Sequence, residues 1–382
     1  MVYQGTISYA YIQHLAVETR RRVESLDLPY EDEYRSHLQY LGSKEKCVLK
    51  LSFVHCPWNI GSARLLAILQ EADILTASEY ILSIDCADST QQIMNDLLET
   101  EYTLLAHLIS FAYKENDRSL ALANILKGCF RSSLTDLKKN PNIIPTNYLA
   151  SLKEHLQPDE LAVVRKEHLH LLLADSEEVC SLDKALAEQE HWRDELQCLN
   201  GSILDAIINE ILVDETNCID TLQKAFEGSA GMSLKHALYM LSALSKSVGE
   251  NNEKAKLVKD WIKALFRETI ETGLTSKLKG LLLLAREICT ANEAILGPYA
   301  SWYKHTIGEM KYNITKNQFV RMIEMLTAVL PFEKSLKMLE IHSTTAISAP
   351  VKCNQLVLDY KQACRVRIAK LSAPLEHSLN VE

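Results

Sequence analysis

The sequence predicts an all-α protein organised as an irregular α-solenoid, in which antiparallel helix pairs stack side by side as HEAT-like units. The chain of 382 residues has only 12 Gly and 9 Pro, which leaves few residues for tight turns, and it is rich in the helix formers Leu, Ala, Glu and Lys. Breaks recur roughly every 15–30 residues, and between them the apolar residues repeat with a helical period. No repeat consensus is visible, and a compact helical bundle is the alternative architecture.

The first half of the chain shows its helices through apolar patterns and start signals. Lys46–Val54 could form a strand, but we interpret it as a short buried helix. Thr76, followed three residues later by Glu79, has the form of a capping box. Pro158–Glu160 has the composition of a first helical turn, so a helix is expected to begin there.

Two breaks that contain glycine separate helices in the middle of the chain. Asn200-Gly201 is the strongest hairpin dipeptide of the sequence, but both of its flanks have helical patterns. We therefore interpret it as the end of one helix, with Ser202 as the start of the next. Gly228-Ser-Ala-Gly231 predicts a flexible link before a helix that begins near Ser233.

Three helices are predicted in the last third, over Lys254–Ile270, Gln318–Leu330 and Asn354–Leu371. A capping box formed by Thr315 and Gln318 starts the second of them. The residues expected to be buried are Leu257, Trp261, Leu265, Phe266 and Ile270 in the first helix, Phe319, Met322, Ile323, Leu326, Val329 and Leu330 in the second, and Leu356, Val357, Tyr360, Cys364, Ile368 and Leu371 in the third. The aromatic cluster of Tyr299, Trp302 and Tyr303 is interpreted as core packing.

Charge is distributed unevenly along the chain, whose formal net charge is −9. Residues 1–228 hold 20 Lys+Arg against 36 Asp+Glu, whereas residues 229–372 hold 21 against 12. This change of sign coincides with the glycine-containing link. We therefore predict an acidic helical module over residues 1–228, a basic helical-repeat module over residues 229–371, and a flexible tail over residues 372–382.

Sequence motifs of the common enzyme classes are absent. The chain has no GxxxxGK[ST] or GxGxxG phosphate loop and no GxSxG nucleophile elbow. Glu167–His170 and Glu188–His191 each contain Glu-x-x-His, the unit of helical di-iron sites, but they lie on neighbouring short helices without the further carboxylates such a site needs. We interpret both as solvated surface and predict no catalytic, cofactor-binding or metal-ligating residue. A helical enzyme assembled from distant residues is a lesser hypothesis.

The cysteines and the N-terminus bear on the cellular location. The 10 Cys are scattered without metal-ligand spacing, which predicts small buried side chains in a reducing compartment rather than disulfides or a zinc site. The first residues do not resemble a signal peptide, and no apolar run exceeds the five residues of Leu281–Ala285, a length too short to span a membrane. A soluble, intracellular protein is expected, and the sequence does not distinguish nucleus from cytoplasm.

Basic residues on the predicted helices of the second module suggest an interaction surface. If adjacent helices align, they form a positive ridge that comprises Lys256, Lys259, Lys263, Arg267, Lys277, Lys279, Lys361, Arg365 and Lys370. We predict a non-catalytic scaffold or adaptor subunit of an intracellular multi-protein complex, which binds other protein subunits through its acidic and basic surfaces. The alternative is a nucleic-acid-associated subunit that binds the phosphate backbone through the ridge. No cofactor and no small-molecule substrate is indicated.

Overall fold

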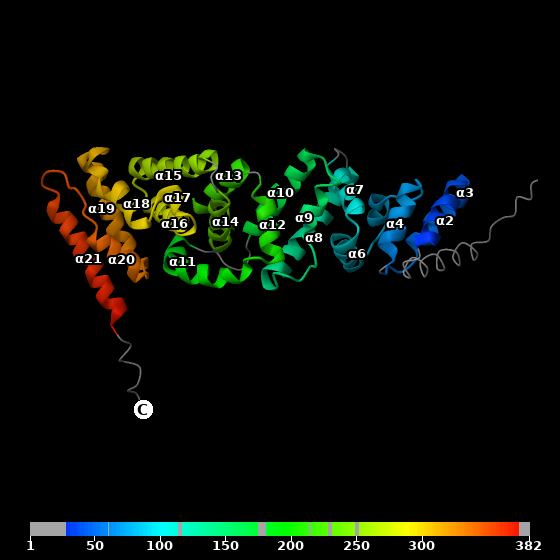
Figure 1. Cartoon of the computed structure of the whole chain (residues 1–382), viewed down its shortest axis with the longest axis horizontal. Coiled ribbons are helices and arrows are strands. Elements are labelled where there is room, and N and C mark those ends of the chain that lie inside the picture. Colours follow the sequence, from blue (N-terminus) through cyan, green and yellow to red (C-terminus); the bar gives the residue numbers. More distant parts are fainter. Residues whose placement is uncertain are drawn as a thin grey trace, which may run out of the picture. The chain divides into compact units, whose positions relative to one another are not determined.

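The regular elements of the protein are helices. The computed structural model describes residues 28–59, 61–113, 117–174, 181–213, 215–227, 231–248 and 252–373. In these ranges the chain forms no strand ladder, and the single isolated β-bridge joins Ala174 to Met232 (Figure 1). The predicted all-α fold class is therefore confirmed, whereas the stacked solenoid stays a prediction.

The chain divides into two compact units. The first contains the residues up to His168 together with Ser202–Glu210, and the second contains Leu169–Gly201 and the residues from Ile211 onward. This division follows packing and not charge. The prediction of an acidic and a basic module that meet at residue 228 concerns surface charge and stays a prediction. Of the predicted tail, residues 374–382 lie outside the described residues.

The first unit is built from helices that surround a central apolar one. Helix α7 is apolar on nearly all sides and buries Leu104, Leu105, Leu108 and Ile109, as expected for a helix enclosed by its neighbours. It contacts α5, α6, α8 and α9. The helices of this unit are α2 (Leu28–Gln39), α3 (Ser43–Val54), α4 (Ser62–Glu71), α5 (Ala77–Leu82), α6 (Ala87–Thr100), α7 (Tyr102–Ala112), α8 (Asp117–Lys139), α9 (Tyr148–Leu152), most of α10 (Pro158–Leu173) and α12 (Ile203–Ile211).

A buried tyrosine–histidine pair lies in the core of the first unit. The Nδ1 of His168 donates to the carbonyl oxygen of Val164 at 2.8 Å, so its Nε2 accepts a hydrogen bond from the hydroxyl of Tyr148 at 2.7 Å. The ring of Phe130 lies 4.4 Å from that of His168. The interpretation of Glu167–His170 as solvated surface is therefore wrong for His168, whose neutral ring is satisfied inside the core.

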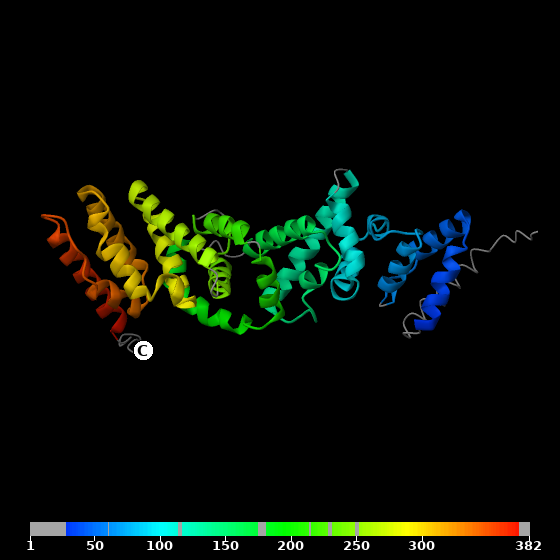
Figure 2. The same cartoon turned by 45° about the horizontal axis from the view of Figure 1, so that its top comes forward.

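The second unit is also built from helices, the longest of which are α15, α16 and α21. Figure 2 shows α19 between α15 and α21, in agreement with the contacts of α19 to both helices. The elements are α11 (Leu182–Leu196), the 3-10 turn η1 (Gln197–Leu199), α13 (Glu215–Phe226), α14 (Leu234–Ser247), α15 (Asn252–Thr272), α16 (Thr275–Ala291), α17 (Glu293–Leu296), α18 (Tyr299–Tyr303), the π-helical turn η2 (Lys304–Gly308), the 3-10 turns η3 (Met310–Tyr312) and η4 (Leu330–Phe332), α19 (Lys316–Val329), α20 (Leu336–Thr344) and α21 (Asn354–Ser372).

Helix α16 is the interior element of the second unit. It contacts α11, α14, α15, α17, α18 and α19. From Gly280 to Cys289 every residue is buried, including the charged Arg286 and Glu287. A helix surrounded in this way has no solvent-facing side on which to place a charge, so both ions need partners inside the unit.

The predicted helix starts agree with the structure. Thr76 with Glu79 and Thr315 with Gln318 form reciprocal capping boxes. The helix predicted over 46–54 is α3. Ser233 caps α14, and the hydroxyl of Ser202 accepts from the amide of Asp205 at the start of α12. Asn200 is the C-cap of the 3-10 turn η1, and Gly201 directly after it has a φ of 75°, the left-handed conformation that glycine commonly adopts after a helix end.

Two predictions about burial are partly wrong. In α15 Leu257 is 42% exposed, because the face that packs inward is centred on Val258, Trp261, Ile262 and Leu265. Of the other residues expected on this face, Trp261, Leu265 and Ile270 are buried and Phe266 is half-buried. Of the cysteines, those at positions 129, 218, 289, 353 and 364 are buried, but those at 47, 86 and 198 are exposed, and Cys180 lies outside the described residues.

Two properties of the described ranges bear on metal binding and on the membrane. No group of three His, Cys, Asp or Glu side chains in them is arranged to hold a metal ion. Among the helices in the same ranges, none is long and apolar enough to cross a membrane.

We predict that Gly308→Ala destabilises the second unit. A β-carbon at position 308 would lie 2.6 Å from the carbonyl oxygen of Ala346, so the loop over residues 345–350 has to move. We expect this movement to lower the free energy of unfolding by about 1–3 kcal/mol. Gly128→Ala is the matched control, because its β-carbon meets nothing within 4 Å in helix α8 and is expected to stabilise by about 0.5–1 kcal/mol. Denaturant titration of both variants measures the difference, and equal effects would contradict the close approach.

The stability of the first unit should depend on pH through His168. Burial lowers its pKa from 6.5 to about 4, so between these values the unfolded chain holds the extra proton and the folded chain does not. The stabilisation is complete above pH 6.5. It is lost as the pH falls, by up to about 1.4 kcal/mol per pH unit, until pH 4 is reached. His168→Gln should flatten this slope in urea titrations at pH 7, 6 and 5, whereas replacing the exposed His55 by Gln should leave it unchanged.

Candidate interaction surface

Four of the predicted basic residues share one face of α15. Lys256, Lys259, Lys263 and Arg267 follow one another at helical spacing, and all are exposed except the half-buried Lys259. The opposite face of the helix is buried, with Trp261 against the ring of Phe226. Because the apolar face fixes how α15 is turned, the four cations project from the unit. We call these four residues the α15 basic row.

The α15 basic row is almost free of internal ion pairs. The ammonium of Lys263 lies 4.0 Å from the carboxylate of Asp260, a loose contact between two exposed side chains. In the described part of the chain, Lys256, Lys259 and Arg267 have no carboxylate partner. Exposed ion pairs contribute little to stability, so these cations are not committed to the fold and are available to a partner.

Lys277 and Lys279, by contrast, are used inside the unit. The ammonium of Lys277 lies 3.1 Å from the carboxylate of Glu227 and 2.9 Å from that of Glu268. Burial acts to lower the pKa of Lys277, but the hydrogen bonds that its ammonium donates to Glu268 and Glu227 outweigh the burial and raise the pKa. Lys279 pairs with Asp183 and lies 4.4 Å above the centre of the Phe332 ring. These two lysines join α16 to its neighbours.

The remaining members of the predicted ridge lie on α21. Arg365 and Lys370 are exposed and Lys361 is half-buried. Helix α19 lies between α15 and α21 in both views (Figures 1 and 2). The nine residues are therefore placed in three sets: the α15 basic row, two internal lysines, and a separate group on α21.

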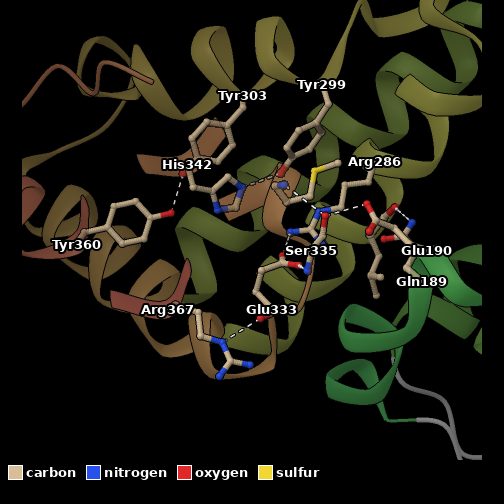
Figure 3. A network of polar contacts seen from close by, with 12 residues as sticks. Gln189, Glu190, Arg286, Tyr299, Tyr303, Glu333, Ser335, His342, Tyr360 and Arg367 are labelled. Carbon is tan, nitrogen blue, oxygen red and sulfur yellow. Dashed lines mark hydrogen bonds and ion pairs between the residues drawn. The ribbon is translucent and has the colours of Figure 1, made fainter. Parts of the chain in front are cut away.

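A buried polar network holds the second unit together, and the sequence analysis did not find it (Figure 3). The guanidinium of Arg286 pairs with the carboxylate of Glu333, and their side chains are only 3% and 1% exposed. The same carboxylate accepts from the amide of Ser335 at 2.9 Å, and the carbonyl oxygen of Glu333 accepts from Arg367 Nε at 3.1 Å. One residue thus joins α16, the start of α20 and α21.

The aromatic cluster predicted as core extends this network. The hydroxyl of Tyr299 lies 3.0 Å from Nε2 of His342, and the hydroxyls of Tyr303 and Tyr360 are 2.9 Å apart. The rings of His342 and Tyr303 stack at 4.3 Å. Burial, together with the charge of Arg286, holds the pKa of His342 well below its usual value, so the ring is neutral.

The second buried ion of α16 is neutralised from α11. The amide nitrogen of Gln189 donates at 3.0 Å to both the carbonyl oxygen of Leu283 and the carboxylate of Glu287. Arg193 pairs with Glu287 at 2.8 Å. A signal for these contacts was present in the sequence, because Arg286-Glu287 directly follows the apolar run Leu281–Ala285, and charges beside such a run need buried partners.

A small pocket lies beside this network. It has a volume of about 190 Å³ and is bordered by α11, α16 and the start of α20. Gln189 Oε1 and Arg286 Nε are buried without a hydrogen-bond partner among the described residues, and both side chains line the pocket. One acceptor and one donor in a space of this size suit ordered water.

We predict that Glu333→Leu lowers the free energy of unfolding by about 3–5 kcal/mol, because it leaves the buried guanidinium of Arg286 without a counter-charge. The double variant Arg286→Met with Glu333→Leu should recover most of this loss. Glu188→Leu, which breaks the exposed pair with Lys334, should cost less than about 1 kcal/mol. A double variant as unstable as the single one in denaturant titrations would contradict the assignment.

Comparison with known proteins identifies the family. The model of the family described as Fanconi anaemia group A protein N terminus matches residues 22–373. The Fanconi anemia group A protein of Homo sapiens is 25% identical over 144 residues, which cover 37% of this chain and 10% of the human protein. No solved structure matches the chain, and neither description names a catalytic activity. Since the family model covers most of the sequence, this chain belongs to the family of the Fanconi anaemia group A protein N terminus.

Proposed function

We propose that this chain is a non-catalytic helical scaffold of an intracellular multi-protein complex, and that the α15 basic row binds an acidic surface of another protein subunit. The observation that carries the proposal is the placement of four cations on one outward face, three of them without a carboxylate partner in the described residues. Membership of the Fanconi anaemia group A protein N terminus family agrees with this proposal, since the description of that family names no catalytic activity. The matched segment is about a tenth of the human protein, so the partners of this chain are part of the proposal.

The acidic part of the chain supplies a second surface of opposite sign. Residues 1–228 hold 16 more acidic than basic residues, and a partner attracted to them is repelled by the α15 basic row. Electrostatic complementarity of this kind determines which partner binds where and raises the rate of association. Two surfaces of opposite charge thus allow one scaffold to hold two different partners in a defined order.

The phosphate backbone of a nucleic acid is the second candidate partner. From Lys256 to Arg267 the row extends about 16 Å along the helix axis, and its cations are free to contact phosphates. Four phosphate contacts give a slope of about −3.6 in log affinity against log salt concentration, which weakens binding about a hundredfold between 50 and 200 mM salt.

Charge reversal tests both candidates. The variant with Lys256, Lys259, Lys263 and Arg267 all replaced by Glu should fold normally, because three of these positions are exposed and the fourth is only half-buried. It should lose a defined subset of the partners that affinity purification and mass spectrometry recover with the unchanged chain. The matched control replaces four other exposed lysines of the same unit by Glu: Lys304, Lys316, Lys337 and Lys352.

The outcomes separate the two hypotheses. Loss of protein partners in the first variant alone, with no duplex binding by the unchanged chain, supports the scaffold. Duplex binding with the steep salt dependence given above, abolished by the first variant alone, supports the nucleic-acid role. An identical set of partners for both variants would show that the α15 basic row is not the interface. Turnover of a nucleotide or ester by the purified chain would contradict a non-catalytic role.

A further inference from the structure

The last described helix, α21, has apolar side chains on its outward face. Leu358, Gln362, Val366 and Ala369 are spaced by four, four and three residues, which places them along one side of the helix over three turns. The side chains of all four residues are exposed. Leu358 is 58% and Val366 is 44% exposed, so both are among the exposed large hydrophobic residues of the protein. We call these four residues the outward stripe of α21; three of them are apolar.

This stripe is separate from the apolar residues that attach α21 to its unit. Val357, Tyr360 and Cys364 are buried, and the helix contacts α19, α20 and η4. Figures 1 and 2 show α21 at one end of the second unit. The helix therefore has apolar residues on two sides, and the described residues cover one of them.

The outermost helix of a unit normally has a polar outer face, because exposed apolar side chains promote association. On α21 the spacing of the exposed apolar side chains suits contact with another helix. Leu358 and Val366 lie about two turns apart and can insert between the side chains of a second helix. The small side chain of Ala369 lets the backbone of that helix come close.

Gln362 interrupts the stripe between Leu358 and Val366. A single polar residue inside an apolar helix–helix seam fixes the register of the pair at some cost in affinity, because its amide needs a polar partner at one position of the opposite helix. The interruption therefore favours a specific partner over indiscriminate apolar association.

Charge along one flank of the stripe indicates the sign of the partner. Lys361 and Arg365 lie one turn apart, beside the stripe, and neither has a carboxylate partner in the described ranges. On the opposite flank the carboxylate of Asp359 already accepts a hydrogen bond from the amide nitrogen of Gln355 at 2.8 Å. In an antiparallel pair of two α21 helices, the Lys361 and Arg365 flanks of the two copies would face each other and repel.

We propose that the outward stripe of α21 binds an amphipathic helix of a partner protein, one whose apolar residues are bordered by Asp or Glu. The apolar side chains supply the contact area, and the carboxylates select the flank formed by Lys361 and Arg365. This surface is distinct from the α15 basic row, so the two proposals succeed or fail separately.

The test uses the full chain and two synthetic helical peptides of about three heptads. Both peptides carry leucines at helical spacing with one central glutamine, and their flanking residues are Glu in one and Lys in the other. Fluorescence anisotropy at low salt should show saturable binding of the Glu-flanked peptide and at least tenfold weaker binding of the Lys-flanked peptide. Failure to bind the Glu-flanked peptide, or equal affinity for both, would overturn the proposal.

Two pairs of variants place the peptide on this face. Leu358→Glu with Val366→Glu should weaken binding at least tenfold, whereas Leu274→Glu with Val351→Glu is the matched control, because both residues are exposed apolar side chains elsewhere in the unit. Lys361→Glu with Arg365→Glu should reverse the preference in favour of the Lys-flanked peptide, an effect that loss of stability cannot produce.

Light scattering of the unchanged chain decides whether a second copy is the occupant. A monomer that binds the Glu-flanked peptide supports the partner helix. A dimer that Leu358→Glu with Val366→Glu dissociates, and the control pair does not, would show that the stripe binds another copy of the chain and would overturn the proposal.

Discussion

The second unit depends on the enclosure of α16. A helix with neighbours on every side cannot place Arg286 and Glu287 in water, and an unpaired buried charge is strongly destabilising. The structure satisfies each ion from a different direction, Arg286 by Glu333 and Glu287 by Arg193 with Gln189. Residues far apart in the sequence are thereby held in one arrangement by the need to neutralise these two ions.

The same enclosure determines which cations reach the surface. Lys277 and Lys279 belong to the first turns of α16, where the surrounding helices bring Glu227, Glu268 and Asp183 against them. The α15 basic row lies on a helix with one open side, so its charges project outward. The positive balance of residues 229–372 is therefore larger than the positive charge that this unit presents to a partner.

Sequence signals predicted helix ends correctly where the hydrogen bonds join residues that are close in the sequence. The capping boxes at Thr76 and Thr315 and the helix end at Asn200-Gly201 involve residues a few positions apart, and the structure has all three. Burial was less predictable, because it depends on which neighbour a helix meets. Leu257 fits a helical stripe as well as Val258 does, but α15 packs against the rest of the unit so that Val258 is buried and Leu257 is exposed. His168 is buried for the same reason.

The sequence by itself determined the helical fold class, the starts of several helices and the positions of the charged side chains along them. These follow from hydrophobic period, from few turn residues and from backbone capping, which act over one or two helical turns. Only the tertiary structure decided which charges are paired inside, which face outward, and that α21 leaves Leu358 and Val366 uncovered. Those properties depend on neighbours that lie tens of residues away in the sequence, and no local sequence pattern predicts which residues these neighbours are.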